Sequence, residues 1–293
     1  MNLALTVLEI VAPVFFMAGI GFTWVKAGFD YPIQFITRLA MTLAVPCLIF
    51  TALMKTNVDL GALWKLTLAS VAGYGAIMIV GWVLLKISGL NTRTYWAPFI
   101  FGNTGNLGLP LALFAFGQPG LERAVVLLAV SAVLSFTIGI GLVAGRGSYD
   151  KMLREPMIWA TLLGAVFLWQ GWETPPFVTN TLELIGQMAI PLMLMTLGVA
   201  IARLSPTHVS TAIWLSVAKF GVCAVIGWGL AVIFDLDATS FGVLVLQLAT
   251  PVAVTAYLLA EKYGADSQSV AGFVVVSTVI SVAGLPLLLG LIL

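Results

Sequence analysis

Two asparagines occupy the middle of an otherwise apolar stretch of this chain. Asn103 and Asn106 lie three residues apart, with Thr104 and Gly105 between them, and they share one face if this segment is helical. Each carboxamide offers N–H donors and a carbonyl acceptor without carrying a charge, which suits a carboxylate that is held and then released. Asparagine is also a favourable N-cap residue, so the pair can instead cap interrupted helices. The two roles are compatible when the cap borders a cavity.

A second apolar run, nearer the end of the chain, is interrupted by Thr250, Pro251, Ala253 and Thr255. Proline lets a membrane helix break, and nearby hydroxyls can satisfy the backbone groups that the break frees. A simple proline kink is the competing interpretation. Gln247, just before this cluster, is a further polar candidate.

Lys219 is a lone charge deep inside an apolar run. A charge in the centre of a membrane helix costs at least about 2.5–3.5 kcal/mol, so such a residue is first considered functional. It can be a counter-ion for an anionic substrate, or a fixed cation at a position where other transporters bind a coupling cation. Snorkelling toward an interface is the alternative, but it is strained for a residue near the middle of its run.

Residue patterns typical of enzymes are missing. The sequence has no HExxH zinc motif and no phosphate-binding P-loop. Its single histidine, His208, stands at the edge of an apolar run, and Cys47 and Cys223 lie within apolar runs where small core residues are expected. We therefore predict no enzymatic activity, no catalytic residue, no metal site and no cofactor.

The elements that must position these residues are membrane helices. Hydrophobic residues make up 61% of the 293 residues and charged residues only 9%, against about 25% charged residues in soluble domains. This composition predicts an all-α polytopic membrane protein with the lipid bilayer around it and no nucleic-acid partner. Because a span needs about 20 apolar residues, we expect ten transmembrane helices, near residues 3–25, 32–54, 62–85, 94–117, 121–144, 156–172, 178–202, 208–234, 238–261 and 268–293.

The fourth span is predicted to be broken at its centre. Gly102, Gly105, Gly108 and Pro110 flank and separate the asparagines, and glycine and proline are poor helix formers. A broken membrane helix survives only inside protein or beside a water-filled cavity. Its half-helix N-terminus, with partial positive charge, can hold an anion there.

The two halves of the sequence resemble each other. The segment around Pro46 resembles the segment around Pro191, and the stretch that ends at Phe116 and Gly117 aligns with the one that ends at Tyr263 and Gly264, which places Asn103 opposite Thr250. Chance similarity between apolar helices is the alternative to internal duplication. A repeat of five spans enters the membrane from opposite sides in its two copies, and such inverted repeats are typical of secondary transporters. We therefore expect a first repeat over 1–146 and a second over 147–293, with Pro46 and Pro191 near the site.

Basic residues favour one orientation. Most lysines and arginines lie in the odd-numbered connections, which the positive-inside rule places in the cytoplasm. The prediction is a plasma-membrane protein, in a bacterial inner membrane, with both termini on the outer side.

The stretch from Gly102 to Leu111, followed by Phe116 and Gly117, resembles the fourth helix of the auxin efflux carrier family of bacteria. Pro251 to Tyr257, followed by Glu261 to Gly264, resembles its ninth helix. The resemblance implies a fold similar to plant PIN auxin exporters, bile-acid transporters and sodium–proton antiporters, with crossing broken helices 4 and 9, an elevator mechanism and a homodimer. Thr255 departs from the family, in which asparagine is common at this position.

These observations predict a secondary transporter for a small organic anion, a carboxylate such as an auxin-like acid, malate or malonate. An anion channel, or a membrane ligand-binding sensor without transport, is the alternative. The expected helix breaks centre on Pro46, Gly108, Pro110 and Pro191. The expected substrate-binding residues are Asn103, Thr104, Gly105, Asn106, Thr250, Pro251, Ala253, Thr255 and Lys219.

Overall fold

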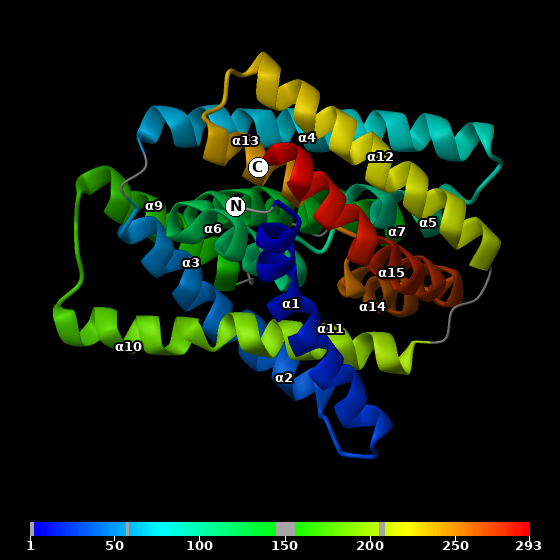
Figure 1. Cartoon of the computed structure of the whole chain (residues 1–293), viewed down its shortest axis with the longest axis horizontal. Helices are drawn as coiled ribbons and strands as arrows, with labels where there is room; N and C mark the ends of the chain where they lie inside the picture. Colours follow the sequence, from blue (N-terminus) through cyan, green and yellow to red (C-terminus); the bar gives the residue numbers. More distant parts are fainter. Residues whose placement is uncertain (1–2, 57–58, 145–155, 205–208) are drawn as a thin grey trace.

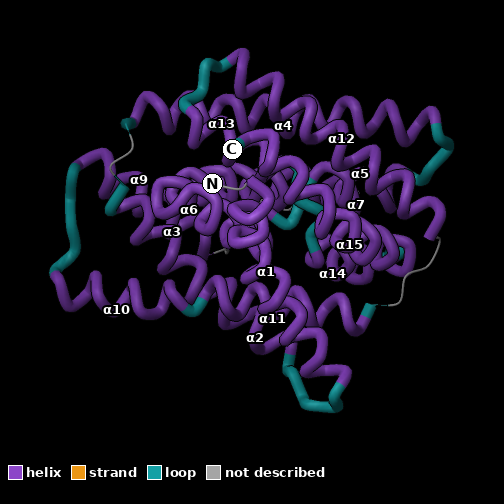
Figure 2. The backbone as a smooth tube through the Cα atoms, in the orientation of Figure 1, coloured by secondary structure: helices purple, strands orange, loops and turns teal. Residues whose placement is uncertain are grey.

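The structure is a computed structural model that describes residues 3–56, 59–144, 156–204 and 209–293. These residues form helices and connecting turns, with one isolated bridge between Gly102 and Val252 (Figures 1 and 2). The predicted boundary between the two repeats, at residues 146 and 147, lies outside the described residues.

The first half of the chain contains a series of helices with three short π-helical turns, named η. In chain order they are α1 (Leu3–Lys26), α2 (Ile33–Leu39), η1 (Ala40–Ala44), α3 (Val45–Met54), α4 (Leu60–Ile87), α5 (Thr92–Ile100), η2 (Thr104–Gly108), α6 (Leu109–Leu134), η3 (Ser135–Gly139) and α7 (Ile140–Ala144). Helix α6 is bent where Gly117 adopts a φ of 64°, a conformation that glycine adopts without steric cost. The bend coincides with the turn predicted between the fourth and fifth spans.

The second half is built from α9 (Pro156–Gln170), α10 (Pro176–Gln187), α11 (Ala189–Arg203), α12 (Val209–Ile233), α13 (Ala238–Leu248), α14 (Val254–Lys262) and α15 (Ser267–Ile292). The sequence predicts spans over 178–202 and 238–261, with breaks at Pro191 and around Thr250 and Pro251. The structure divides both ranges, at Met188 between α10 and α11 and at residues 249–253 between α13 and α14.

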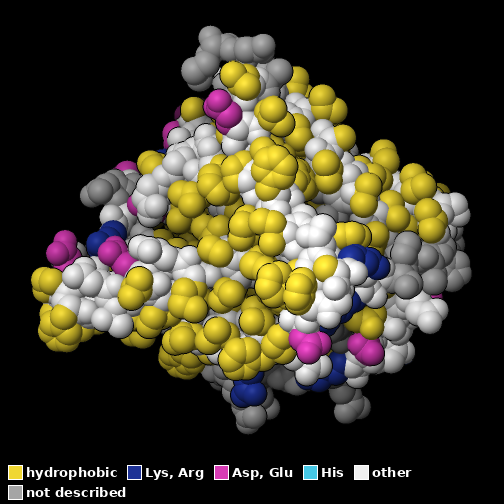
Figure 3. Space-filling view, turned by 60° about the horizontal axis from the view of Figure 1, so that its bottom comes forward, with side chains coloured by type: hydrophobic (Ala, Val, Ile, Leu, Met, Phe, Trp, Pro, Cys, Tyr) yellow, Lys and Arg dark blue, Asp and Glu magenta, His cyan; other side chains and the backbone are white. Residues whose placement is uncertain are grey.

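Seven helical segments among the described residues are long and apolar enough to cross a membrane. They are Val7–Lys26, Ile33–Met54, Leu60–Ile87, Thr104–Val143, Pro176–Arg203, Val209–Ile233 and Ser267–Ile292. Two further apolar helices, α9 and α13, are shorter. Hydrophobic side chains cover much of the face seen in Figure 3, and charged side chains lie mostly toward its margins. The chain is therefore a polytopic membrane protein, and its described residues fold into helices joined by turns.

The helices pack in two groups. In one, α4 and α12 lie side by side and pack with α13, while α5, α14 and α15 pack beside them (Figure 1). In the other, α1 packs on α11, and α3 packs on α9 and α10. Helix α6 contacts both groups, so the two broken segments in the first group are held close to the second.

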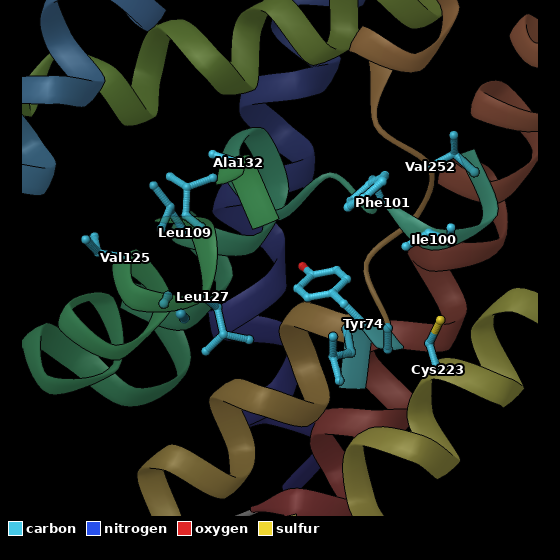
Figure 4. Packing of buried hydrophobic residues seen from close by; sticks show 14 of the residues in the cluster. Tyr74, Ile100, Phe101, Leu109, Val125, Leu127, Ala132, Cys223 and Val252 are labelled. Carbon is cyan, nitrogen blue, oxygen red and sulfur yellow. The ribbon is translucent and has the colours of Figure 1, made fainter. Parts of the chain in front are cut away.

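A buried core surrounds the first break. The ring of Phe101, in the connection between α5 and η2, stacks on Tyr74 of α4 with the ring centroids 5.8 Å apart (Figure 4). Cys223 of α12 is buried in the same core, as predicted, whereas Cys47 is half-buried. This packing fixes the backbone on which the candidate site is built.

Candidate functional site

Two non-helical segments cross inside the protein. Helix α5 ends at Ile100, and η2 begins at Thr104. Helix α13 ends at Leu248, and α14 begins at Val254. Gly102 and Val252 form an antiparallel bridge where the connections meet, and the backbone N–H of Asn103 donates to the carbonyl of Pro251 over 2.7 Å. Four helix ends consequently meet at one point.

The backbone groups that the second break frees find partners within the protein. The hydroxyl of Thr250 donates to the carbonyl of Gln247 over 2.7 Å, and the N–H of Val252 donates to the hydroxyl oxygen of Ser277 over 3.1 Å. Such pairing is what a break at membrane depth requires, because no water is available in lipid.

Close approach of the two segments requires glycine at two positions. A Cβ atom on Gly102 would collide with the hydroxyl oxygen of Thr250 and lie 2.9 Å from its carbonyl oxygen. A Cβ atom on Gly108 would collide with the side-chain carboxamide of Gln247. The glycines of the fourth span therefore allow the crossing itself, which is a more specific role than weakening the helix.

A cavity of about 580 Å³ lies against the N-terminal ends of the two helices that follow the breaks. Of the predicted binding residues, it brings together Asn103, Thr104, Gly105, Asn106, Ala253 and Thr255. Met41, Val45 and Met193, from the neighbouring group of helices, line the same cavity. Pockets of this size hold small organic ligands.

Asn103 lines this cavity and carries an unpaired donor. The residue holds the N-cap position of η2, but its side chain makes no capping hydrogen bond. Its Nδ2 atom has no hydrogen-bond partner among the described residues, although the residue is only 4% exposed. Buried polar groups are normally paired, so this amide is an unsatisfied donor within the wall of the cavity. Asn106 is 8% exposed and lines the same wall.

The cavity is also lined by polar residues that were not among the predicted binding residues. Ser131 and Ser135 line it from α6 and η3, and Lys262 and Tyr263 line it from the end of α14. Lys262 is exposed, so it marks the side from which the cavity is reached. The four-residue spacing of the two serines places both on one face of a helix and could have predicted a polar face there. Lys262 lies at the end of a predicted span, where a lysine is expected in any membrane protein.

Three predicted binding residues lie away from this wall. Lys219, Thr250 and Pro251 line a second cavity of about 10 Å³, on the side of the crossing that carries the ends of α5 and α13. Lys219 is 1% exposed, and its Nζ donates to the carbonyl of Phe99 over 2.8 Å. Its side chain therefore points into the protein interior, which removes the snorkelling alternative.

The prolines expected at helix breaks have different environments. Pro110 is buried near the start of α6, which continues directly from η2. Pro46 follows η1 at the start of α3, and Pro191 is exposed in the first turn of α11. Neither lines the large cavity, but their neighbours Val45 and Met193 do.

Metal-binding side chains are not grouped in the part of the chain that the structure describes. Within it, no three His, Cys, Asp or Glu residues come together in an arrangement that could hold an ion. The polar chemistry of the large cavity is that of amides, hydroxyls, helix N-termini and the ammonium of Lys262.

Comparison with known proteins gives a family and several relatives. The family model described as "Membrane transport protein" matches residues 6–152 and 146–289. An "Uncharacterized transporter" of Methanothermobacter thermautotrophicus is 27% identical over 269 residues, which is 86% of each chain. The "Putative malonate transporter" of Rhizobium meliloti is 22% identical over 270 residues, covering 85% of this chain and 84% of the relative. A rice protein named "Probable auxin efflux carrier component 9" is 28% identical over 140 residues, covering 45% of this chain and 32% of the relative.

Proposed function

Since this chain belongs to the membrane transport protein family, the auxin efflux carrier family that its motifs resemble, we propose that it is a secondary transporter for a small organic anion that carries a carboxylate. The observation that carries the proposal is the unpaired amide of Asn103 at a cavity bounded by two helix N-termini. The relative named for malonate supports a carboxylate as the recognised group. As a member of a transport family, the chain is assigned to transport and not to catalysis.

The chemistry of the cavity suits a carboxylate. The first N–H groups of a helix lack helical partners, and the helix dipole adds partial positive charge at that end. The η2–α6 segment and α14 both begin at the cavity. A carboxylate oxygen would accept from Asn103 Nδ2 and so satisfy a donor whose burial without a partner costs about 1–3 kcal/mol. Because these donors are neutral overall, the anion can also leave.

The remaining wall suits the body of an organic acid. Met41, Val45, Leu128 and Met193 supply an apolar surface opposite the helix ends. Lys262, exposed at the cavity, would raise the local concentration of anions and steer them inward. This combination favours an organic carboxylate over an inorganic anion.

The proposed mechanism is alternating access by an elevator motion. We assign ten spans in two inverted repeats, 1–146 and 147–293, whose broken helices form the crossing. The group built from α4–α7 and α12–α15 would carry the substrate past the group built from α1–α3 and α9–α11. The division of the helices into these two packed groups supports this assignment. The second group would form a homodimer in a bacterial inner membrane, with both termini outside.

Flux measurements in proteoliposomes test the function. Labelled malonate, malate and indole-3-acetate are offered with and without unlabelled acid on the opposite side. We expect saturable uptake and counterflow for at least one of these acids. Flux that neither saturates nor shows counterflow would indicate a channel, and binding without flux would indicate a sensor.

The matched variants are Asn103→Ala in the cavity and Asn180→Ala on the exposed face of α10. We expect Asn103→Ala to lower kcat/KM by about tenfold or more, because a hydrogen bond to a charged group contributes about 1.5–3 kcal/mol. Asn180→Ala should transport like the wild type. Equal transport by both variants would remove Asn103 from the binding site.

A further inference from the structure

Lys219 lies on the side of the crossing away from the candidate substrate cavity. Its Nζ donates to the carbonyl of Phe99, in the last turn of α5, over 2.8 Å. The ring of Phe99 is fully buried, and its centroid lies 5.9 Å from Nζ. The ammonium is thus held at a defined point of the backbone, at the C-terminal end of the first half-helix.

The helix break explains why this carbonyl is free. In a continuous helix, the carbonyl of Phe99 would accept from the N–H of Asn103, four residues on. In this structure that N–H donates across the crossing to Pro251. The break therefore leaves a carbonyl without its helical partner at the negative end of the α5 dipole, and Lys219 binds it.

The surroundings of Lys219 favour a cation and offer nothing to an anion. Ser216, Ser277 and Ser281 line the small cavity beside it, and their hydroxyls donate to the helix carbonyls of Ala212, Val274 and Thr278. Their protons are therefore committed, and only oxygen lone pairs remain for the cavity. In the described part of the chain, Lys219 forms no ion pair with a carboxylate. At about 10 Å³ the cavity has room for one water at most, which excludes a carboxylate substrate.

In secondary transporters with broken helices, unwound carbonyls and half-helix C-termini are the groups that coordinate a dissociable Na⁺ or H⁺. We propose that Lys219 is a tethered cation that fills this position permanently. Its ammonium neutralises the end of α5 and holds the crossing in shape, so transport needs no soluble monovalent cation. Lys219 is a positioning residue, because it acts through Phe99 and the crossing and does not touch the substrate. The inference rests on the proposed transport function.

Cation replacement tests the proposal on the wild-type protein. Transport and the Tm in detergent are measured in sodium, lithium, potassium and choline chloride at equal ionic strength. We expect the same transport rate and the same Tm in all four salts. Wild-type transport that requires sodium or lithium, or a wild-type Tm that rises in these salts relative to choline, would overturn the proposal.

Two substitutions separate charge from volume. Lys219→Ala removes the ammonium and leaves space for an ion, whereas Lys219→Met removes the ammonium and fills the space. In choline, both variants should transport at least about tenfold more slowly than the wild type, the effect of losing one charged hydrogen bond. Sodium or lithium should restore transport several-fold and raise the Tm of Lys219→Ala only. Lys86→Ala, at the exposed end of α4, is the control and should match the wild type.

Full transport by Lys219→Ala in choline would contradict the proposal, as would equal responses of the Ala and Met variants to sodium. The Tm measurements need no substrate. They therefore test the tethered cation even if no organic acid shows counterflow, in which case the proposed transport function alone would fail.

Discussion

At the scale of single residues, Asn103 connects the crossing to the cavity. Its N–H donates to Pro251, its carbonyl accepts from Leu107 and Gly108, and its Nδ2 remains without a partner among the described residues. The backbone of this residue therefore holds the two broken helices together, while its side-chain amide stays unpaired. The sequence indicated both a capping role and a binding role for this asparagine. The structure has the N-cap position without the capping hydrogen bond.

The crossing also depends on the absence of a side chain at Gly102. We expect Gly102→Ala to destabilise the protein by about 1–3 kcal/mol, the usual cost of overpacking, because the new methyl group would meet Thr250. Transport should fall with it, since the substitution pushes the two segments apart. The measurement is the Tm in detergent together with counterflow.

Gly75→Ala is the control, because a Cβ atom there meets nothing within 4 Å. Alanine also has the higher helix propensity, so this variant should be as stable as the wild type or slightly more stable. Equal Tm values for Gly102→Ala and the wild type would show that the crossing can relax around a methyl group.

At the scale of elements, the sequence indicated where helices break better than where each piece ends. The breaks at residues 101–103 and 249–253 coincide with clusters of glycine, proline and hydroxyl residues, whose local chemistry is visible in one sequence. The pairing of Gly102 with Val252 was not predictable residue by residue, because it depends on how two distant helices cross. A break was also expected at Pro191, and the structure divides α10 from α11 at Met188, three residues before this proline.

Asp237 caps the N-terminus of α13, and its charge predicts how the stability of the fold depends on pH. Asp237 accepts from the N–H of Ser240 over 3.1 Å and pairs with Arg123 at 3.2 Å. Burial raises the pKa of this carboxyl, but the hydrogen bonds from Ser240 and the charge of Arg123 outweigh burial, and the pKa is held below its ordinary value. A carboxyl with a lowered pKa stabilises the fold while it is ionised. Its contribution is complete above the unfolded pKa of about 3.9 and is lost as the pH falls through the lower folded value.

We therefore expect Asp237→Asn to have a lower Tm than the wild type at pH 6, with the difference shrinking below about pH 4. The loss at pH 6 should be within the range of about 0.5–2 kcal/mol found for N-cap substitutions. Asp235→Asn is the control, because this exposed residue lies in the same connection with a φ of 48°, a conformation that asparagine also adopts. A difference between wild type and Asp237→Asn that stays constant down to pH 3 would mean that the charge of Asp237 does not stabilise the fold.

At the scale of the whole molecule, composition alone predicted the class of protein, and the family match confirms the resemblance drawn from the two crossing motifs. What the sequence could not provide is how the polar side chains divide between the two sides of the crossing. Asn103 and Thr255 line the large cavity, whereas Lys219 and Thr250 lie on the other side. All four belong to apolar runs, and one sequence carries no signal for which face of a crossing each side chain occupies. The repeats, the orientation and the dimer stay predictions.

Alternating access gives a prediction for the whole molecule, because a carrier opens its site to one side at a time. Thr255 is exposed and lines the large cavity together with Lys262. The positive-inside rule places the connection that carries Lys262 at the cytoplasmic side. In a variant with Cys47 and Cys223 replaced by Ala, we expect Thr255→Cys to react with a membrane-impermeant thiol reagent from the cytoplasmic side. Bound substrate should slow this reaction by occupying the cavity. Reagent added outside should react only as fast as the carrier turns over, so labelling from outside should rise when counterflow is running.

A cysteine in the exposed first turn of α10, Phe177→Cys, serves as the control, whose reaction should not depend on substrate. Equal, substrate-independent labelling of Thr255→Cys from both sides would indicate a continuous pore and would replace the carrier with a channel.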